Sequence, residues 1–215
     1  MYKQKNLLFL FIVVIAATIN VSAQTKSDIF SKDVEVTWLG LDFTAARLIG
    51  DREKYGSESD VKHLMTAWNE LILNEPDKYN VAKAIGRSKV TNSIEAVNDR
   101  NAEVDVQTMF SDDQKDYLHI KAGDVDGIIA DYDFKGKTGI GLVFIVESFS
   151  KPAVEGSMYV TFVNMGSKEI LLSERLTGEP KGFGMRNYWA GAVYGVLTKM
   201  QKKEFENWRK TSSRP

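Results

Sequence analysis

Apolar and polar positions alternate along two segments, VEVTWLGLDF at residues 34–43 and GIGLVFIVESF at residues 139–149. In both, apolar side chains fall on the two faces of an extended chain, which is typical of a strand buried within a sheet. The alternation in the first segment changes phase at Gly40. The pattern therefore predicts two buried strands, and the second belongs at the centre of a sheet.

Two more alternating segments follow the second strand. MYVTFVN begins at Met158 and EILLSERL begins at Glu169, and a short polar turn precedes each of them. Loops of this length join antiparallel neighbours. Residues 139–177 are therefore predicted to form a three-stranded antiparallel meander.

Spacings of three and four residues between apolar positions predict three helices. The first runs from a cap at Ser57 or Ser59 to Pro76, and the second starts at Asp124 or Gly123. The third covers about residues 187–209, and its apolar stripe shifts phase towards its end. Residues 77–110 fit neither period cleanly, and we interpret residues 88–97 as a strand.

The expected order of elements is strand, helix, strand, helix, three strands and a long helix. No repeat and no low-complexity linker divides the chain. We therefore expect one α+β domain over residues 24–215. Its mixed sheet has about five strands with a C-terminal antiparallel meander, packed against two or three helices, and the last helix covers the meander.

The first 23 residues have the pattern of a secretory signal peptide. Lys3 and Lys5 precede an apolar run, Leu7–Ile19, that is shorter than the roughly 20 residues needed to cross a membrane. We expect cleavage after Ala23 and a periplasmic or secreted protein without a stable membrane anchor. A retained N-terminal anchor is the alternative.

Composition narrows the chemistry further. The chain has no cysteine, which excludes disulfides, thiolate nucleophiles and a thioether-linked lipid. After removal of residues 1–23, 26 basic side chains face 29 acidic ones, a net charge of −3. A mildly acidic chain without a basic stripe argues against nucleic acid as a partner.

The clustered aspartates raise the question of calcium. Asp131, Asp133 and Gly136 match three positions of an EF-hand loop, but Lys135 and Leu142 stand where ligands belong. Helix caps and solvated turns explain these aspartates better. We expect no metal and no cofactor.

Catalytic motifs give no assignment either. His63 and His119 lack a second histidine at helical spacing, so no zinc site is visible. Two well-placed carboxylates are enough for a hydrolase, and the 29 acidic residues do not indicate which pair that would be. We therefore assign no catalytic residue.

The segment GEPKGFGMRNYWAG, residues 178–191, places glycines before the last helix. It lacks the third glycine of a dinucleotide fingerprint, at Asn187, and the Gly-Lys-Ser/Thr of a P-loop. Two interpretations remain: a bend, which we favour because glycine permits positive φ, and an anion site on the helix N terminus. The candidate binding residues are Lys181, Gly182, Gly184, Arg186 and Trp189.

Gly191 and Gly195 lie within the predicted last helix, where each costs about 1 kcal/mol relative to alanine. A close approach of the helix to the sheet explains them most simply. Alternatively, Tyr188, Trp189 and Tyr194 form an aromatic docking surface for a partner. We favour burial.

The succession GIGLVFIVESF, MYVTFVN and EILLSERLTGEPKGFGMRNYWAG, within residues 111–197, resembles a group of exported proteins of Bacteroides-like bacteria without an assigned activity. The order of elements is also similar to the α/β domain of the curli secretion lipoproteins and of the TolB N-terminal domain. This second resemblance is one of architecture, and no functional residue carries over. It implies an accessory or assembly role in the cell envelope.

The leading hypothesis is a non-enzymatic envelope protein that binds a protein partner through its last helix and glycine loop. A secreted hydrolase that uses carboxylates is the alternative. A carrier of a small ligand or an anion is the third class.

Overall fold

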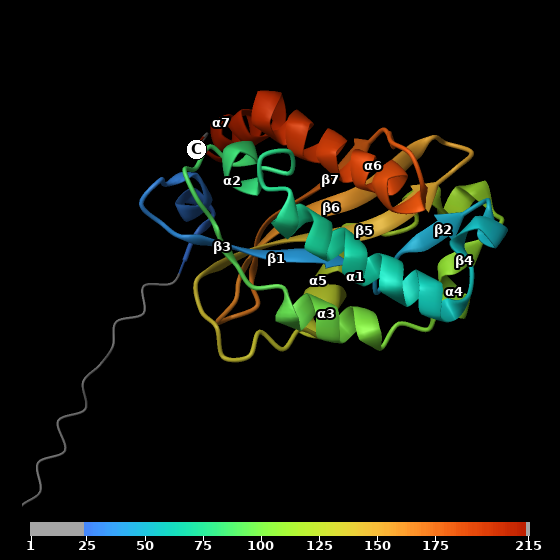
Figure 1. Cartoon of the computed structure of the whole chain (residues 1–215). Coiled ribbons are helices and arrows are strands. Elements are labelled where there is room, and N and C mark those ends of the chain that lie inside the picture. Colours follow the sequence, from blue (N-terminus) through green and yellow to red (C-terminus); the bar gives the residue numbers. More distant parts are fainter. Residues whose placement is uncertain (1–23, 214–215) are drawn as a thin grey trace, which may run out of the picture.

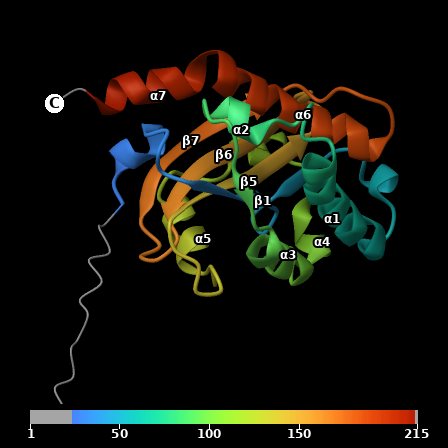
Figure 2. The same cartoon turned by 60° about the vertical axis from the view of Figure 1, so that its left-hand side comes forward.

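A computed structural model describes residues 24–213 of the chain (Figure 1). The predicted signal peptide, residues 1–23, lies outside this range. Helices pack on both faces of a mixed sheet, and Figure 2 shows α6 and α7 along one side of it and α5 on the other. The fold is mixed α+β, as the sequence predicts.

The strands and helices are as follows. The strands are β1 (Val36–Asp42), β2 (Arg47–Ile49), β3 (Thr91–Asn92), β4 (Phe110–Ser111), β5 (Ile140–Ser150), β6 (Glu155–Asn164) and β7 (Ile170–Gly178). The α-helices are α1 (Glu58–Asn74), α2 (Val81–Ala84), α3 (Glu95–Ala102), α4 (Val106–Met109), α5 (Asp124–Ala130), α6 (Met185–Lys199) and α7 (Phe205–Ser212). Short 3-10 helices are η1 (Lys26–Phe30), η2 (Arg52–Tyr55) and η3 (Gln114–Leu118), and a π-helical turn (Met200–Glu204) joins α6 to α7.

Strand β5 is the centre of the sheet. Along one edge it pairs in parallel with β1 and then with β2, and along the other it pairs antiparallel with β6. Strands β3 and β4 extend the sheet beyond β1 and β2, and β7 pairs antiparallel with β6. The described residues thus form seven strands rather than about five. Because β1 and β2 follow one another along the same edge, the seven occupy five positions across the sheet.

The two faces of the sheet carry separate apolar cores. One contains Trp68 of α1, Phe149 of β5 and Trp189 of α6. The other contains Val97 of α3 and Val125 of α5. Strand β5 supplies side chains to both cores, which agrees with its apolar residues on both faces in the sequence. Within residues 24–213, no helix has both the length and the apolar character needed to span a membrane.

In residues 77–110 the structure differs from the prediction, because most of the expected strand is absent. Only Thr91–Asn92 of the strand expected at residues 88–97 pairs with β1, and Glu95 begins helix α3. Asn101 at the end of α3 hydrogen-bonds to both Leu41 O and Phe43 N of the β1 segment. These hydrogen bonds fix α3 against β1, although α3 has only a weak apolar stripe.

Each of the two changes of phase in the apolar pattern corresponds to an irregularity of the structure. At Gly40 the register of β1 against β5 shifts between Trp38 and Gly40. Near the C terminus, the π-helical turn rotates α7 relative to α6. Phe205 consequently packs against Phe30, with ring centres 5.3 Å apart.

Glycines allow α6 to lie directly on the end of β7. A Cβ on Gly178 would lie 2.8 Å from the carbonyl carbon of Ala192 and closer still to its oxygen. A Cβ on Gly191 would lie 2.9 Å from Lys181 Cα and closer to Lys181 N and O. The close approach expected for the helical glycines is therefore present. Gly191 and Gly195 face main-chain atoms at the end of β7 and just after it.

Helix α1 begins where the sequence predicts, at a capping box. Ser57 Oγ accepts a hydrogen bond from Asp60 N at 3.2 Å, and Ser57 N donates to Asp60 Oδ2 at 2.7 Å. Replacing Ser57 with alanine is expected to lower the free energy of unfolding by about 1 kcal/mol, because the cap is lost. Urea denaturation of the two proteins measures this, and Ser59→Ala, inside the same turn, should change it less.

Candidate ligand-binding pocket at the N terminus of α6

The glycine loop delivers the chain into α6 without a side-chain cap. Gly182 and Gly184 have φ values of 139° and 77°, which a side chain would strain. Gly184 occupies the N-cap position and makes no side-chain hydrogen bond to the helix, and the first turn holds no acidic residue. The first N–H groups of this 15-residue helix therefore present a partial positive charge without a side-chain partner.

A cavity of about 200 Å3 adjoins this helix end. Its walls come from the segment after β2, from the β5–β6 turn and from the glycine loop with the first turn of α6. The residues that line it are Gly50, Asp51, Lys54, Tyr55, Lys151, Gly182, Phe183, Gly184, Met185, Tyr188 and Trp189.

Tyr55 is the buried polar group of this pocket. Its side chain is 2% exposed, and its hydroxyl has no partner of full hydrogen-bond geometry among the described residues. Burial raises the pKa of Tyr55 well above that of a free phenol, and a weaker hydrogen-bond interaction with the indole of Trp189 opposes part of this rise. The phenol therefore stays neutral and keeps its proton available for donation.

Two lysines and one aspartate give the lining a positive charge in excess. Lys151 Nζ lies 3.9 Å from the centre of the Tyr188 ring, as a cation–π contact. Lys54 Nζ lies 2.9 Å from Asp51 Oδ2, and this hydrogen bond lowers the pKa of Asp51. The charge of Lys151 also lowers the pKa of Asp51, but Lys151 forms no salt bridge with it among the described residues and stays over the Tyr188 ring.

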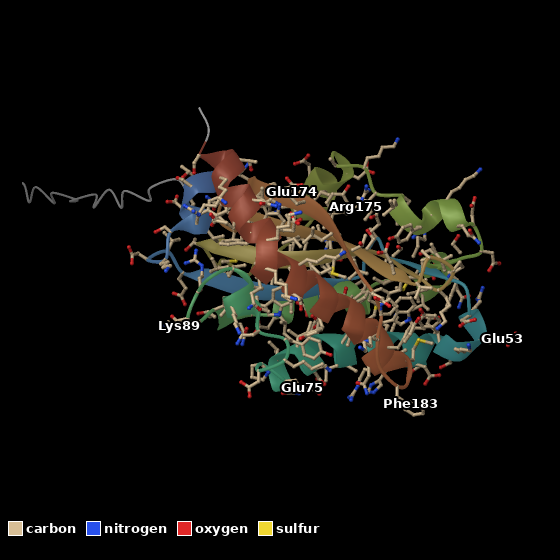
Figure 3. All side chains as sticks on the ribbon, turned by 90° about the horizontal axis from the view of Figure 1, so that it is seen from above. Glu53, Glu75, Lys89, Glu174, Arg175 and Phe183 are labelled. Carbon is tan, nitrogen blue, oxygen red and sulfur yellow. The ribbon has the colours of Figure 1, made fainter. Side chains whose placement is uncertain are left out.

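Aromatic side chains form the apolar part of the pocket. Trp189 is 1% exposed and stacks flat on Phe149, with ring centres 4.7 Å apart. Phe183 is 95% exposed and projects from the loop (Figure 3). The interpretation of Trp189 as an exposed docking anchor is therefore wrong, and Trp189 serves as a fixed wall instead.

The five candidate residues from the sequence separate into two groups. Gly182, Gly184 and Trp189 line the pocket, whereas Lys181 and Arg186 do not. The latter two act through their main chain: Lys181 N donates to Tyr188 O at 3.0 Å, and Arg186 O accepts from Trp68 Nε1 at 2.9 Å.

Sequence reasoning missed Lys54, Tyr55 and Lys151. Lys54 and Tyr55 belong to the short helix η2 and Lys151 to the β5–β6 turn, all outside the glycine segment, and no motif marks them.

The buried carboxylates are engaged elsewhere. Asp42 lies 3.2 Å from Arg100 Nε and accepts from Thr44 and Tyr132. Glu147 is paired with Arg175. Each of these buried acids is therefore paired with an arginine of the fold.

A larger cavity of about 510 Å3 lies beside Arg100, among acidic side chains of α3 and of the segment after α5. Lys135 on its wall pairs with Asp99 at 3.1 Å and with Asp133 at 3.5 Å. Across the described part of the chain, no three His, Asp or Glu side chains are grouped to hold a metal ion. The lining carries five acids and two bases, so this cavity has a net negative charge and does not suit an anionic ligand.

No family model matches the chain, and no curated protein matches it. The fold and the pocket together define a mixed α+β protein with a cationic, aromatic pocket at an uncapped helix N terminus.

Proposed function

We propose that this protein is a non-catalytic binding protein of the cell envelope that captures an acidic group of a macromolecular partner at the N terminus of α6. The signal-peptide pattern supports the export of the chain, and the resemblance to envelope accessory domains agrees with an assembly role. One observation carries the binding proposal: the uncapped N terminus of α6 opens on a cavity that Lys54, Lys151 and the buried Tyr55 also line.

The chemistry of the pocket favours a carboxylate next to an apolar side chain. Backbone N–H groups at a helix N terminus, an ammonium group and a phenol are all donors that suit an anion. Tyr188 and Trp189 offer apolar surface beside them. Phe183, which is exposed at the rim, is placed to cover a bound segment of the partner.

The experiment compares two probes of nearly equal size and shape, N-acetylphenylalanine, which ends in a carboxylate, and its C-terminal amide, which is uncharged there. Calorimetric titration of residues 24–215 should give saturable binding of the acid and at least about tenfold weaker binding of the amide, because the amide lacks the charge. Lys151→Gln and Tyr55→Phe should each weaken the acid about five- to tenfold, since each removes one donor.

Lys89→Gln supplies the matched control, because Lys89 does not line this pocket. It removes the same charge from the protein and should leave the affinity unchanged. Equal binding of acid and amide, or an equal loss in Lys89→Gln and Lys151→Gln, would contradict the proposal.

A further inference from the structure

Three segments that are far apart in the sequence meet at one end of the molecule. They are residues 26–35 with η1, residues 81–90 with α2, and residues 199–213 with the π-helical turn and α7. Figure 1 shows α7, α2 and the blue segment of η1 gathered beside the C-terminal label. Phe205 packs on Phe30, and Arg87 Nη2 donates to Ile29 O at 2.9 Å, so the three segments form one continuous surface.

The charge of this surface differs in sign from that of the rest of the protein. The three segments carry ten basic and five acidic residues, a net charge of +5, and we call them the basic end. The other residues of 24–215 carry 16 basic and 24 acidic ones, a net charge of −8. The small net charge of the whole chain therefore conceals a strong separation of charge along the molecule.

The cations of the basic end face solvent. Nine of the ten are exposed, whereas Arg87 is half-buried and binds main-chain oxygens. Six of the nine form no ion pair within the described residues; Lys203 pairs with Glu204, and Arg209 and Lys210 pair with Glu206. The nine are Lys26, Lys32, Lys83, Lys89, Lys199, Lys202, Lys203, Arg209 and Lys210.

The basic end exposes charge without large apolar side chains. The large hydrophobic residues that are exposed within residues 24–213 are Leu118, Val154, Phe183 and Tyr194, and none of them belongs to the three segments. A partner would therefore be held by electrostatic attraction, without insertion of an aromatic or aliphatic anchor. Such a contact is reversible and weakens when salt is added.

The position of the N-terminal residues indicates what this surface meets. Gln24 directly precedes the segment that contains η1, and the apolar run Leu7–Ile19 stands shortly before it in the sequence. A signal peptide engages the export membrane through such a run. Residue 24 therefore emerges close to the membrane, and the basic end is the part of the fold nearest to it along the chain.

We propose that the basic end binds the headgroups of anionic phospholipids at the surface of the membrane across which the chain is exported. Each lysine close to an anionic membrane surface strengthens binding about fivefold, so the six unpaired lysines are enough for reversible attachment. The acidic remainder is repelled by the same surface, which fixes the orientation of the bound protein. No residue that lines the α6 pocket belongs to the basic end, so the two sites are separate.

The test measures co-sedimentation of residues 24–215 with two kinds of vesicle, one of phosphatidylcholine alone and one with about 30% phosphatidylglycerol. Only the anionic vesicles should bind the protein at low salt. Their binding should fall at least tenfold between about 50 and 300 mM sodium chloride, because the shorter Debye length screens the lysines.

Lys83→Gln/Lys202→Gln removes two cations of the basic end, one from α2 and one from the neighbouring π-helical turn. It should weaken binding to the anionic vesicles at least about tenfold. The matched control is Lys115→Gln/Lys121→Gln, on η3 and on the segment before α5, which changes the net charge equally and should leave binding unaltered. None of the four lysines forms an ion pair within residues 24–213, so all three proteins should have the same thermal midpoint.

Three results would overturn the proposal. One is that the protein binds neither vesicle, or binds both equally. Another is that the control loses as much binding as Lys83→Gln/Lys202→Gln, since a general charge effect would then explain the attraction. The last is tighter binding to a DNA duplex than to the anionic vesicles at the same phosphate concentration, which would make a nucleic acid the partner.

Discussion

Replacing Gly191 with alanine is expected to lower the free energy of unfolding by about 2–3 kcal/mol, although alanine is the better helix former by about 1 kcal/mol. The new Cβ would lie 2.9 Å from Lys181 Cα and closer to the main-chain N and O of the same residue. Because these are backbone atoms, α6 would have to move away from the end of β7. Urea denaturation of both proteins measures the difference.

Gly127 provides the control for this substitution. It lies within α5, and nothing stands within 4 Å of a Cβ built on it. Gly127→Ala should therefore raise the free energy of unfolding, by up to about 1 kcal/mol. If Gly191→Ala stabilises the protein as Gly127→Ala does, α6 does not lie against the segment after β7.

Replacing Arg175 with methionine is expected to cost about 3–5 kcal/mol of stability, because it leaves the carboxylate of Glu147 buried without a counter-charge. Arg175 Nη2 donates to Glu147 Oε1 at 2.9 Å. Arg175 Nε lies 2.8 Å from Oε2 as an ion-pair contact without hydrogen-bond geometry. Ile120 N and Ser157 Oγ each donate to the same carboxylate at 2.7 Å, so the acid is held from β7, from β6 and from the segment before α5.

The double variant Glu147→Gln/Arg175→Met separates charge from packing. With no charge left to bury, it should recover a large part of the loss seen in Arg175→Met. The exposed pair of Arg209 and Glu206 offers the comparison, and Arg209→Met should change stability little because solvent screens that pair. A double variant as unstable as Arg175→Met would mean that the buried charge is not the cause.

Local signals in the sequence placed the long elements well. The cap at Ser57 and the period up to Pro76 match α1, and the phase change at Gly40 matches the shift in register of β1. The strand expected at residues 88–97 failed because α3 depends on Asn101, which bonds to a strand 58 and 60 residues away. Such a contact leaves no periodic pattern in its own segment.

The candidate site was visible in the sequence only through its glycines. Gly182 and Gly184 mark the bend into α6, since their positive φ values restrict the residue type. Lys54, Tyr55 and Lys151 join them only through folding, and burial of Tyr55 could not be read from its neighbours. The sequence allowed two positions for Trp189, buried against the sheet or exposed on a docking surface. Its stacking on Phe149 shows that it is buried.

The face that α7 turns towards the rest of the protein depends on the number of residues in the π-helical turn between α6 and α7. A regular helix rotates by about 100° per residue, so a chain one residue shorter between Met200 and Phe205 would continue without interruption but turn α7 by that angle. Phe205 would then lose its contacts with Phe30 and Phe162, and the buried Trp208 would be displaced from its present position. Deleting one residue of this turn would therefore separate α7 from η1 and leave the helix itself continuous.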